Sequence, residues 1–245
     1  MKYILSLPIF NHTTQNFKAL LMLAWGFFPF ITVLLFVDSP WFAQNIFDGR
    51  YLADILTLSY FGLLFHHSDA HLRKLLFVMI FLSYLGELIF CNGAGMYDYR
   101  TPYVPFYVPF GHSIVYATGY IFAHTQWAAR HDKALRPIFI VFYALVFLLV
   151  GYYWNDHFSL LFGLLFFVLV RRKRWQNVYF FIGIAVFTTE LIGTYYNCWV
   201  WRPITYGGLA TANPPLGAVF FYGGGDVLLD KIVWYYERKI QTILT

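Results

Sequence analysis

Long apolar segments separated by short polar ones run along the whole chain. A helix rises about 1.5 Å per residue, so roughly 20 apolar residues cross the ~30 Å hydrocarbon layer of a membrane. Eight segments approach or reach this length, at residues 19–37, 51–66, 74–92, 108–125, 136–154, 157–171, 175–195 and 213–234. The pattern therefore predicts an all-α integral membrane protein with eight transmembrane helices, of which the second and sixth are short.

Basic residues are distributed unevenly among the predicted connections. With eight spans, the two termini and the connections after spans 2, 4 and 6 lie on one side of the membrane. That side holds all but three of the 17 Lys and Arg residues, and the exceptions are Arg50, Arg100 and Arg202. Because cytoplasmic connections carry an excess of Lys and Arg, we predict that both termini are cytoplasmic.

One sequence motif occurs twice, beginning with Glu-Leu-Ile at Glu87 and again at Glu190. Each copy continues with two aromatic residues two positions apart, an Arg, and then Pro-x-Gly-x-x-x-x-Tyr-x-x-Gly. The first copy contains Tyr97, Tyr99, Arg100, Pro109, Gly111, Tyr116 and Gly119; the second contains Trp199, Trp201, Arg202, Pro215, Gly217, Tyr222 and Gly225. Phe-Gly-Leu-Leu-Phe also recurs, at 61–65 and 162–166.

These repeats predict the architecture. Each half of the chain, 1–125 and 126–245, contains four spans. Because four is an even number, the halves have the same orientation in the membrane and form parallel repeats related by an axis along the membrane normal. Such halves enclose a shared central cavity, so we expect a single membrane domain over residues 1–245.

Composition supports this interpretation. The chain is 60% hydrophobic and only 12% charged, whereas a soluble domain has about 25% charged residues. The pI near 9.1 reflects the basic residues of one membrane side, so no nucleic-acid partner is predicted. We expect a protein of a bacterial inner (plasma) membrane, and the sequence leaves homo-oligomer formation open.

Four of the ionisable residues inside predicted spans stand out: Glu87, His112, Glu190 and Asp226. An ionisable group at this depth is costly and is a functional candidate by default. A carboxyl group in a low-dielectric site can donate a proton near neutral pH, and two that converge can act as acid and base. We predict these four residues as catalytic. In the alternative, each glutamate binds the Arg or a Tyr hydroxyl of its own copy and only holds the connection in place.

The two copies of the motif differ at polar positions. His112 aligns with Ala218, and Tyr120 aligns with Asp226. A duplicated scaffold that loses its symmetry at polar positions is expected to do so where a ligand binds, which makes Asp226 the first candidate. Aromatic residues of the motif are predicted to bind the substrate, namely Tyr97, Tyr99, Tyr116, Trp199, Trp201 and Tyr222.

Histidine and cysteine raise two further possibilities. His67 and His71 are four residues apart beside His66 and could share a metal-binding face, although we expect an interfacial loop without metal. No cofactor is predicted, because the chain lacks a P-loop, a GxGxxG, a GxSxG and a CxxC motif. Cys91 and Cys198 both fall on the predicted outer side, where they could form a disulfide or remain as small apolar residues.

Two resemblances suggest a chemistry. The first copy, with Glu-Leu-Ile, Tyr97-x-Tyr99 and Val-Pro-Phe-Tyr-Val-Pro, resembles the membrane carotenoid hydratase and carotenoid synthesis family, as does Trp199-x-Trp201 in the second. Glu87 together with the segment 226–237 is similar to small integral-membrane terpene cyclases. Both resemblances imply that a buried carboxylic acid protonates an isoprenoid double bond and that aromatic faces stabilise the resulting carbocation.

We therefore predict an intramembrane enzyme that uses buried carboxyl groups to protonate, hydrate or cyclise an isoprenoid or related membrane lipid. Two alternatives remain open. The protein could be a proton-coupled carrier, or a protein that binds a lipid or small molecule, whose halves move around the same cavity. It could also be a non-catalytic subunit of a membrane complex.

Overall fold

The computed structural model describes residues 15–205 and 207–244. Predictions for the residues before Gln15, including Lys2 and the side of the membrane on which the N-terminus lies, fall outside this range. The helices are α1 (Gln15–Asp38), α2 (Pro40–Asn45), α3 (Arg50–His67), α4 (Ala70–Glu87), the π-helical turn η1 (Leu88–Gly93), α5 (Val108–Ala123), α6 (Gln126–Arg130), α7 (Asp132–Tyr153), α8 (His157–Arg172), α9 (Asn177–Tyr195), the 3-10 turn η2 (Leu216–Ala218) and α10 (Val219–Leu244). The strands are β1 (Tyr97–Tyr99), β2 (Trp199–Trp201), β3 (Ile204–Thr205) and β4 (Leu209–Ala210).

Each predicted apolar segment contains one long helix, and the chain is mostly helical. Within the described residues, four helical segments are long and apolar enough to cross a membrane: Asn16–Asp38, Ala70–Gly93, Asp132–Tyr153 and Asn177–Tyr195. The last helix begins and ends later than its predicted segment. Its polar C-terminal part packs on the start of α4, where His71 Nδ1 and Lys74 Nζ contact Glu237 Oε1 at 3.0 and 2.9 Å. This contact stabilises the part of α10 that extends beyond the predicted apolar segment.

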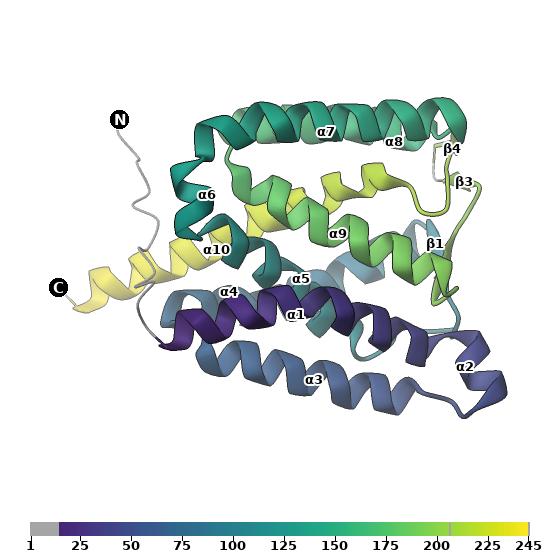
Figure 1. Cartoon of the computed structure of the whole chain (residues 1–245), viewed down its shortest axis with the longest axis horizontal. Coiled ribbons are helices and arrows are strands. Elements are labelled where there is room, and N and C mark those ends of the chain that lie inside the picture. Colours follow the sequence, from purple (N-terminus) through teal and green to yellow (C-terminus); the bar gives the residue numbers. More distant parts are fainter. Residues whose placement is uncertain (1–14, 206, 245) are drawn as a thin grey trace.

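The helices form one bundle around α5 and α9, while α4 and α10 lie on its surface with part of their side chains exposed (Figure 1). Helix α5 packs closely against α9, and α10 packs against α4. Helices α1 and α3 cover α5, while α7 and α8 pack together on the α9 and α10 side. Large apolar side chains point outward, among them Phe81, Leu148 and Leu164. An apolar outer surface is expected where lipid replaces water as the solvent.

Two connections form a feature that the helical prediction missed. Strands β1 and β2, from the connections after η1 and α9, pair antiparallel with Tyr97 opposite Trp201 and Tyr99 opposite Trp199. Tyr, Trp and Val favour strands, and alternate residues of a strand face the same side. The four aromatic side chains therefore point into the bundle. Three-residue strands are too short to show a period in the sequence.

The two cysteines are unpaired. Cys91 Sγ lies 3.3 Å from Tyr97 O, and Cys198 Sγ lies 3.1 Å from Leu35 O. Each thiol thus donates to a different backbone carbonyl, which agrees with the interpretation of both cysteines as small apolar residues.

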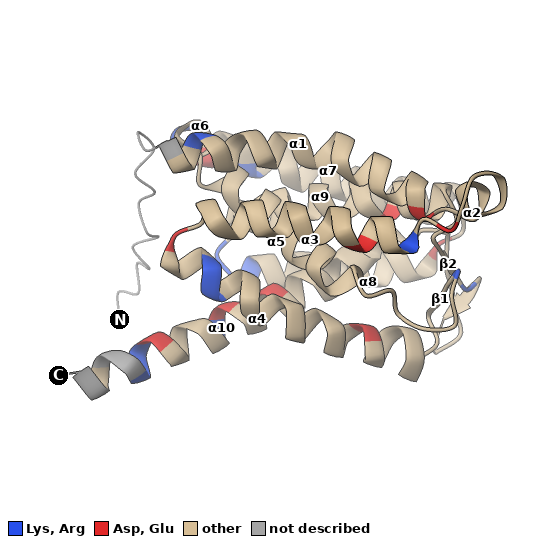
Figure 2. Ribbon diagram, turned by 90° about the horizontal axis from the view of Figure 1, so that it is seen from below, with Lys and Arg blue, Asp and Glu red and all other residues tan. Residues whose placement is uncertain are grey.

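Charged residues separate toward the two ends of the bundle (Figure 2). Most Lys and Arg residues lie at the end with the α3–α4 and α8–α9 connections, which we call the basic end. The opposite end, the strand end, carries Arg50, Arg100 and Arg202, each paired with a carboxylate. Hydrogen bonds from Arg50 and Arg100 hold the pKa of Asp48 well below its ordinary value.

Two glycines at equivalent positions of the motif predict opposite responses to alanine. A Cβ at Gly119 in α5 would lie 2.4 Å from the backbone of Ile182 in α9, whereas a Cβ at Gly225 in α10 meets nothing within 4 Å. We expect Gly119→Ala to destabilise the fold by about 1–3 kcal/mol or more, since the two backbones must separate. Gly225→Ala should be neutral or gain up to about 1 kcal/mol of helix propensity. Thermal unfolding of both variants in detergent tests this, and equal midpoints would contradict it.

Candidate functional site

Glu87 lies at the C-terminal end of α4 and is almost completely buried. Its Oε2 accepts hydrogen bonds from the hydroxyls of Tyr97 and Tyr99, at 2.7 and 2.9 Å. Its Oε1 lies 2.9 Å from Nε2 of His112 in α5. Strand β1 thus supplies two of the three partners. Glu87 therefore also holds the connection between η1 and α5 in place, as the alternative prediction states.

Glu190 of α9 has an equivalent set of partners from the second copy of the motif. Its Oε2 accepts from the indole nitrogens of Trp199 and Trp201, at 2.9 and 3.1 Å. Its Oε1 accepts from the hydroxyl of Tyr222 in α10, at 2.9 Å. Neither glutamate pairs with the Arg of its own copy: Arg100 binds Asp38 and Asp48, and Arg202 binds Asp98.

The two glutamates differ in what their partners allow. An indole N–H can only donate, whereas a tyrosine hydroxyl or a neutral histidine can donate or accept. Two indoles therefore require Glu190 Oε2 to act as an acceptor. Glu87 has no such restriction and can exchange a proton with His112. Glu190 is thus held by two groups that can only donate, whereas each partner of Glu87 could also accept.

A ring contact connects His112, a partner of Glu87, with Tyr222, a partner of Glu190. The ring of His112 stacks on the ring of Tyr222, with centroids 5.1 Å apart and planes 20° apart. A small cavity of about 60 Å³ is bordered by both Glu87 and Glu190 on the side of α1. The two motif copies thus meet in one polar cluster.

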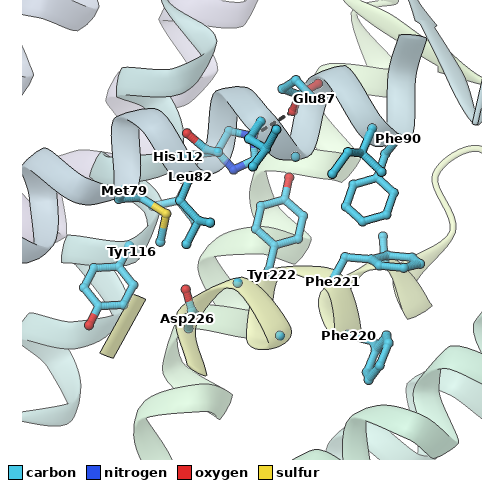
Figure 3. A pocket seen from close by; sticks show the side chains of 18 of the residues that line it. Met79, Leu82, Glu87, Phe90, His112, Tyr116, Phe220, Phe221, Tyr222 and Asp226 are labelled. Carbon is cyan, nitrogen blue, oxygen red and sulfur yellow. Dashed lines mark hydrogen bonds and ion pairs between the residues drawn. The ribbon is translucent and has the colours of Figure 1, made fainter. Parts of the chain in front are cut away.

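A larger cavity of about 340 Å³ lies between α4, α5, α9 and α10 (Figure 3). Three carboxyl-bearing residues line it, namely Glu87, Glu190 and Asp226, while most of its other walls are apolar. Asp226 is 3% exposed, and its Oδ2 has no hydrogen-bond partner within the part of the chain that the structure describes. A buried carboxyl group without a partner strongly favours its neutral form, because burial of an isolated charge is very costly.

One side of this cavity faces the outer surface of the bundle between α4 and α10. Its lining includes Leu85, Ile89 and Leu228, whose side chains are exposed. Gly224 and Gly225 also line it, and a Cβ at either position would meet no atom within 4 Å. The cavity therefore borders the outer surface of the bundle along exposed apolar side chains of α4, η1 and α10.

The structure brings together most of the predicted site residues. All four predicted catalytic residues line the larger cavity, as do Tyr97, Tyr116, Trp201 and Tyr222. Tyr99 and Trp199 do not line it, and both border the small cavity. Phe90 and Phe221, whose rings lie 4.6 Å apart, line the larger cavity without having been predicted. In a chain with 28 Phe, no sequence signal distinguishes them.

The histidine-rich connection shows no arrangement for a metal. Over residues 15–205 and 207–244, no group of three or more His, Cys, Asp or Glu side chains is placed to hold a metal ion. His71 instead binds Glu237, and His67 Nδ1 lies 3.5 Å from Asn16 Oδ1.

Comparisons of the chain with protein-family models, with curated proteins and with solved structures found no match. The resemblances noted in the sequence therefore stay predictions.

Proposed function

We propose that the protein is an intramembrane enzyme that transfers protons to and from a double bond of an isoprenoid or related lipid. The observation that supports this most directly is the placement of Glu87, Glu190 and Asp226 on one cavity that has mostly apolar walls and exposed apolar side chains at its edge. Carboxyl groups at this depth are functional candidates, and the apolar walls suit a hydrocarbon substrate.

In this proposal Asp226 is the acid, because its carboxyl group has no competing hydrogen bond at Oδ2 among the described residues. Its proton adds to one carbon of the double bond, and the second carbon becomes a carbocation. Charge on that carbon is stabilised by the Glu190 carboxylate and by the nearby rings of Phe90 and Phe221. Loss of a proton to Glu87 and His112 completes an isomerisation. In a hydration, water attacks the carbocation and then loses its extra proton to Glu87 and His112. In a cyclisation, a second double bond attacks, the charge moves to a further carbon, and loss of a proton from the neighbouring carbon to Glu87 and His112 gives the neutral product.

The size of the cavity suggests which part of the lipid reacts. An apolar cavity of about 150 Å³ holds one benzene molecule, so the cavity of about 340 Å³ accommodates only one end of a long isoprenoid. The remainder of such a molecule would pass between α4 and α10 into the membrane.

We propose in addition that all eight long helices cross a bacterial inner membrane as two parallel repeats with cytoplasmic termini. In two repeats, α4 would correspond to α9 and α5 to α10. A two-fold axis would then relate the packing of α5 on α9 to the packing of α10 on α4, and both contacts are present. The antiparallel pairing of β1 with β2, which brings Tyr97 opposite Trp201 and Tyr99 opposite Trp199, supports an axis between the two motif copies. Basic residues gather at one end of the bundle, as the positive-inside rule requires of a cytoplasmic side.

Deuterium incorporation tests the enzymatic proposal. The purified protein in vesicles would be given a linear isoprenoid polyene with unsaturated ends in D₂O, and the extracted lipid analysed by mass spectrometry. We expect deuterium on carbon with the wild type. We expect neither binding nor incorporation with Gly225→Leu, because that side chain fills open space in the cavity.

Gly225→Ala is the matched control, since one methyl group leaves most of the cavity open. A lipid that binds and is released without deuterium would instead favour a carrier. An absence of lipid binding in the wild type would exclude both functions.

A further inference from the structure

An acid inside an apolar cavity needs a source of protons for the next turnover, and this inference rests on the proposed function of Asp226. The strand end offers no evident supply. There Glu87 and Glu190 accept hydrogen bonds from aromatic and histidine side chains, and in the proposed reaction Glu87 and His112 receive a proton, which His112, 20% exposed, returns to water. The supply is therefore to be sought toward the basic end.

Asp230 lies one helical turn beyond Asp226 in that direction. Side chains four residues apart on a helix have Cβ atoms about 5–6 Å apart. Asp226 is buried, whereas Asp230 is exposed. Asp230 also interacts electrostatically with Lys173, at the end of α8, and with His71, near the start of α4. It is thus the carboxyl group next to Asp226 that can exchange protons outside the cavity.

Two tyrosine hydroxyls lie near both aspartates. Tyr116 of α5 lines the cavity beside Asp226, and its hydroxyl is 3.4 Å from Asp230 Oδ1 (Figure 3). Tyr179 of α9 is 2% exposed and interacts electrostatically with both aspartates. Its hydroxyl, like Asp226 Oδ2, is buried and has no hydrogen-bond partner among the described residues. Two unpartnered polar groups of this kind are suited to hold a proton or a bridging water between them.

We propose that Asp230, Tyr116 and Tyr179 form a proton path that reprotonates Asp226 from the basic end. Asp230 takes a proton from water and passes it to a tyrosine hydroxyl or a water bound beside it. That group releases its own proton toward Asp226, so each member returns to its starting state. No oxidant or co-reactant is required, and the only net transfer is one proton from water to Asp226.

Infrared spectroscopy can follow this transfer without any substrate. The C=O stretch of the neutral Asp226 carboxyl group, assigned by its loss in Asp226→Asn, shifts when the protein in vesicles is moved into D₂O. We expect Asp230→Asn to slow this shift on the order of 10²-fold, the lower end of what a positioned proton donor contributes. Tyr116→Phe and Tyr179→Phe should slow it less, since each leaves the other hydroxyl. Acetate, a small diffusible acid, should restore part of the rate in Asp230→Asn.

Tyr143→Phe is the matched control, because it removes a buried hydroxyl that donates to Phe180 O outside the cavity. An unchanged rate in Asp230→Asn would overturn the path even if the wild type turns over lipid. A slowed rate without any lipid turnover would keep the path and reject the enzyme. Absence of an Asp226 C=O band in the wild type would reject both.

Discussion

Replacing Asp226 by asparagine is expected to lower turnover of the lipid by about 10²–10⁴-fold, the usual contribution of a general acid. Asparagine has nearly the same shape but no acidic proton. Because Asp226 Oδ2 has no hydrogen-bond partner among the described residues, the change should leave the fold and lipid binding intact. The measurement is the rate of deuterium incorporation in D₂O, alongside the amount of lipid bound.

Asp156→Asn provides the matched control. Asp156 is also buried, but it caps α8 by accepting from the Ser159 backbone N–H at 2.8 Å and lies outside the cavity. Asparagine is an equally good N-cap, so turnover should stay at the wild-type level. If Asp226→Asn retained wild-type turnover, Asp226 would not be the acid, and the Glu87–His112 pair would be the remaining candidate.

Replacing Arg100 by methionine is expected to reduce the free energy of unfolding by about 3–5 kcal/mol, the typical cost of removing one partner of a buried ion pair. Arg100 donates from Nε and Nη2 to Asp38 Oδ1, at 3.1 and 2.8 Å, and Asp38 is 1% exposed. Without the guanidinium, only the Tyr107 hydroxyl remains on this carboxylate, at 2.6 Å. Chemical or thermal unfolding in detergent measures the change.

Arg202 occupies the equivalent position in the second copy of the motif and serves as the control. Its partner is Asp98, and both side chains are more than half exposed. Exposed ion pairs contribute little to stability because water and salt screen them, so Arg202→Met should have little effect. Adding Asp38→Asn to Arg100→Met should recover part of the lost stability, because the unpaired charge is removed. Equal losses from the two arginine variants would contradict this assignment.

The pairing of Arg202 with Asp98 also changes the acidity of the Asp98 carboxyl group. Hydrogen bonds from Arg202 lower the pKa of the Asp98 carboxyl group, yet the exposure of both groups limits what this adds to stability. Sequence alone predicts identical roles for Arg100 and Arg202, since both follow an aromatic pair at the same spacing. Their surroundings differ because Asp38 ends α1 next to Arg100, and α1 is far from both arginines in the sequence.

The mostly helical fold, the approximate positions of its long helices and the candidate carboxyl groups could be read from the sequence. Long apolar segments have few folded solutions, since a helix satisfies its own backbone hydrogen bonds in an apolar surrounding. Glu87, Glu190 and Asp226 were conspicuous because ionisable residues are rare at such depth. These are local properties, determined by each segment whatever its neighbours are.

Only the tertiary structure decided which side chains meet. It placed Glu87 and Glu190 on one cavity, gave Glu190 two indole donors and Glu87 a histidine, and left Asp226 Oδ2 without a partner among the described residues. It also assigned Tyr99 and Trp199 to the small cavity behind them. These contacts join residues from four helices and two strands, so they depend on how the helices pack and how the strands align. A hydropathy period carries no information on either.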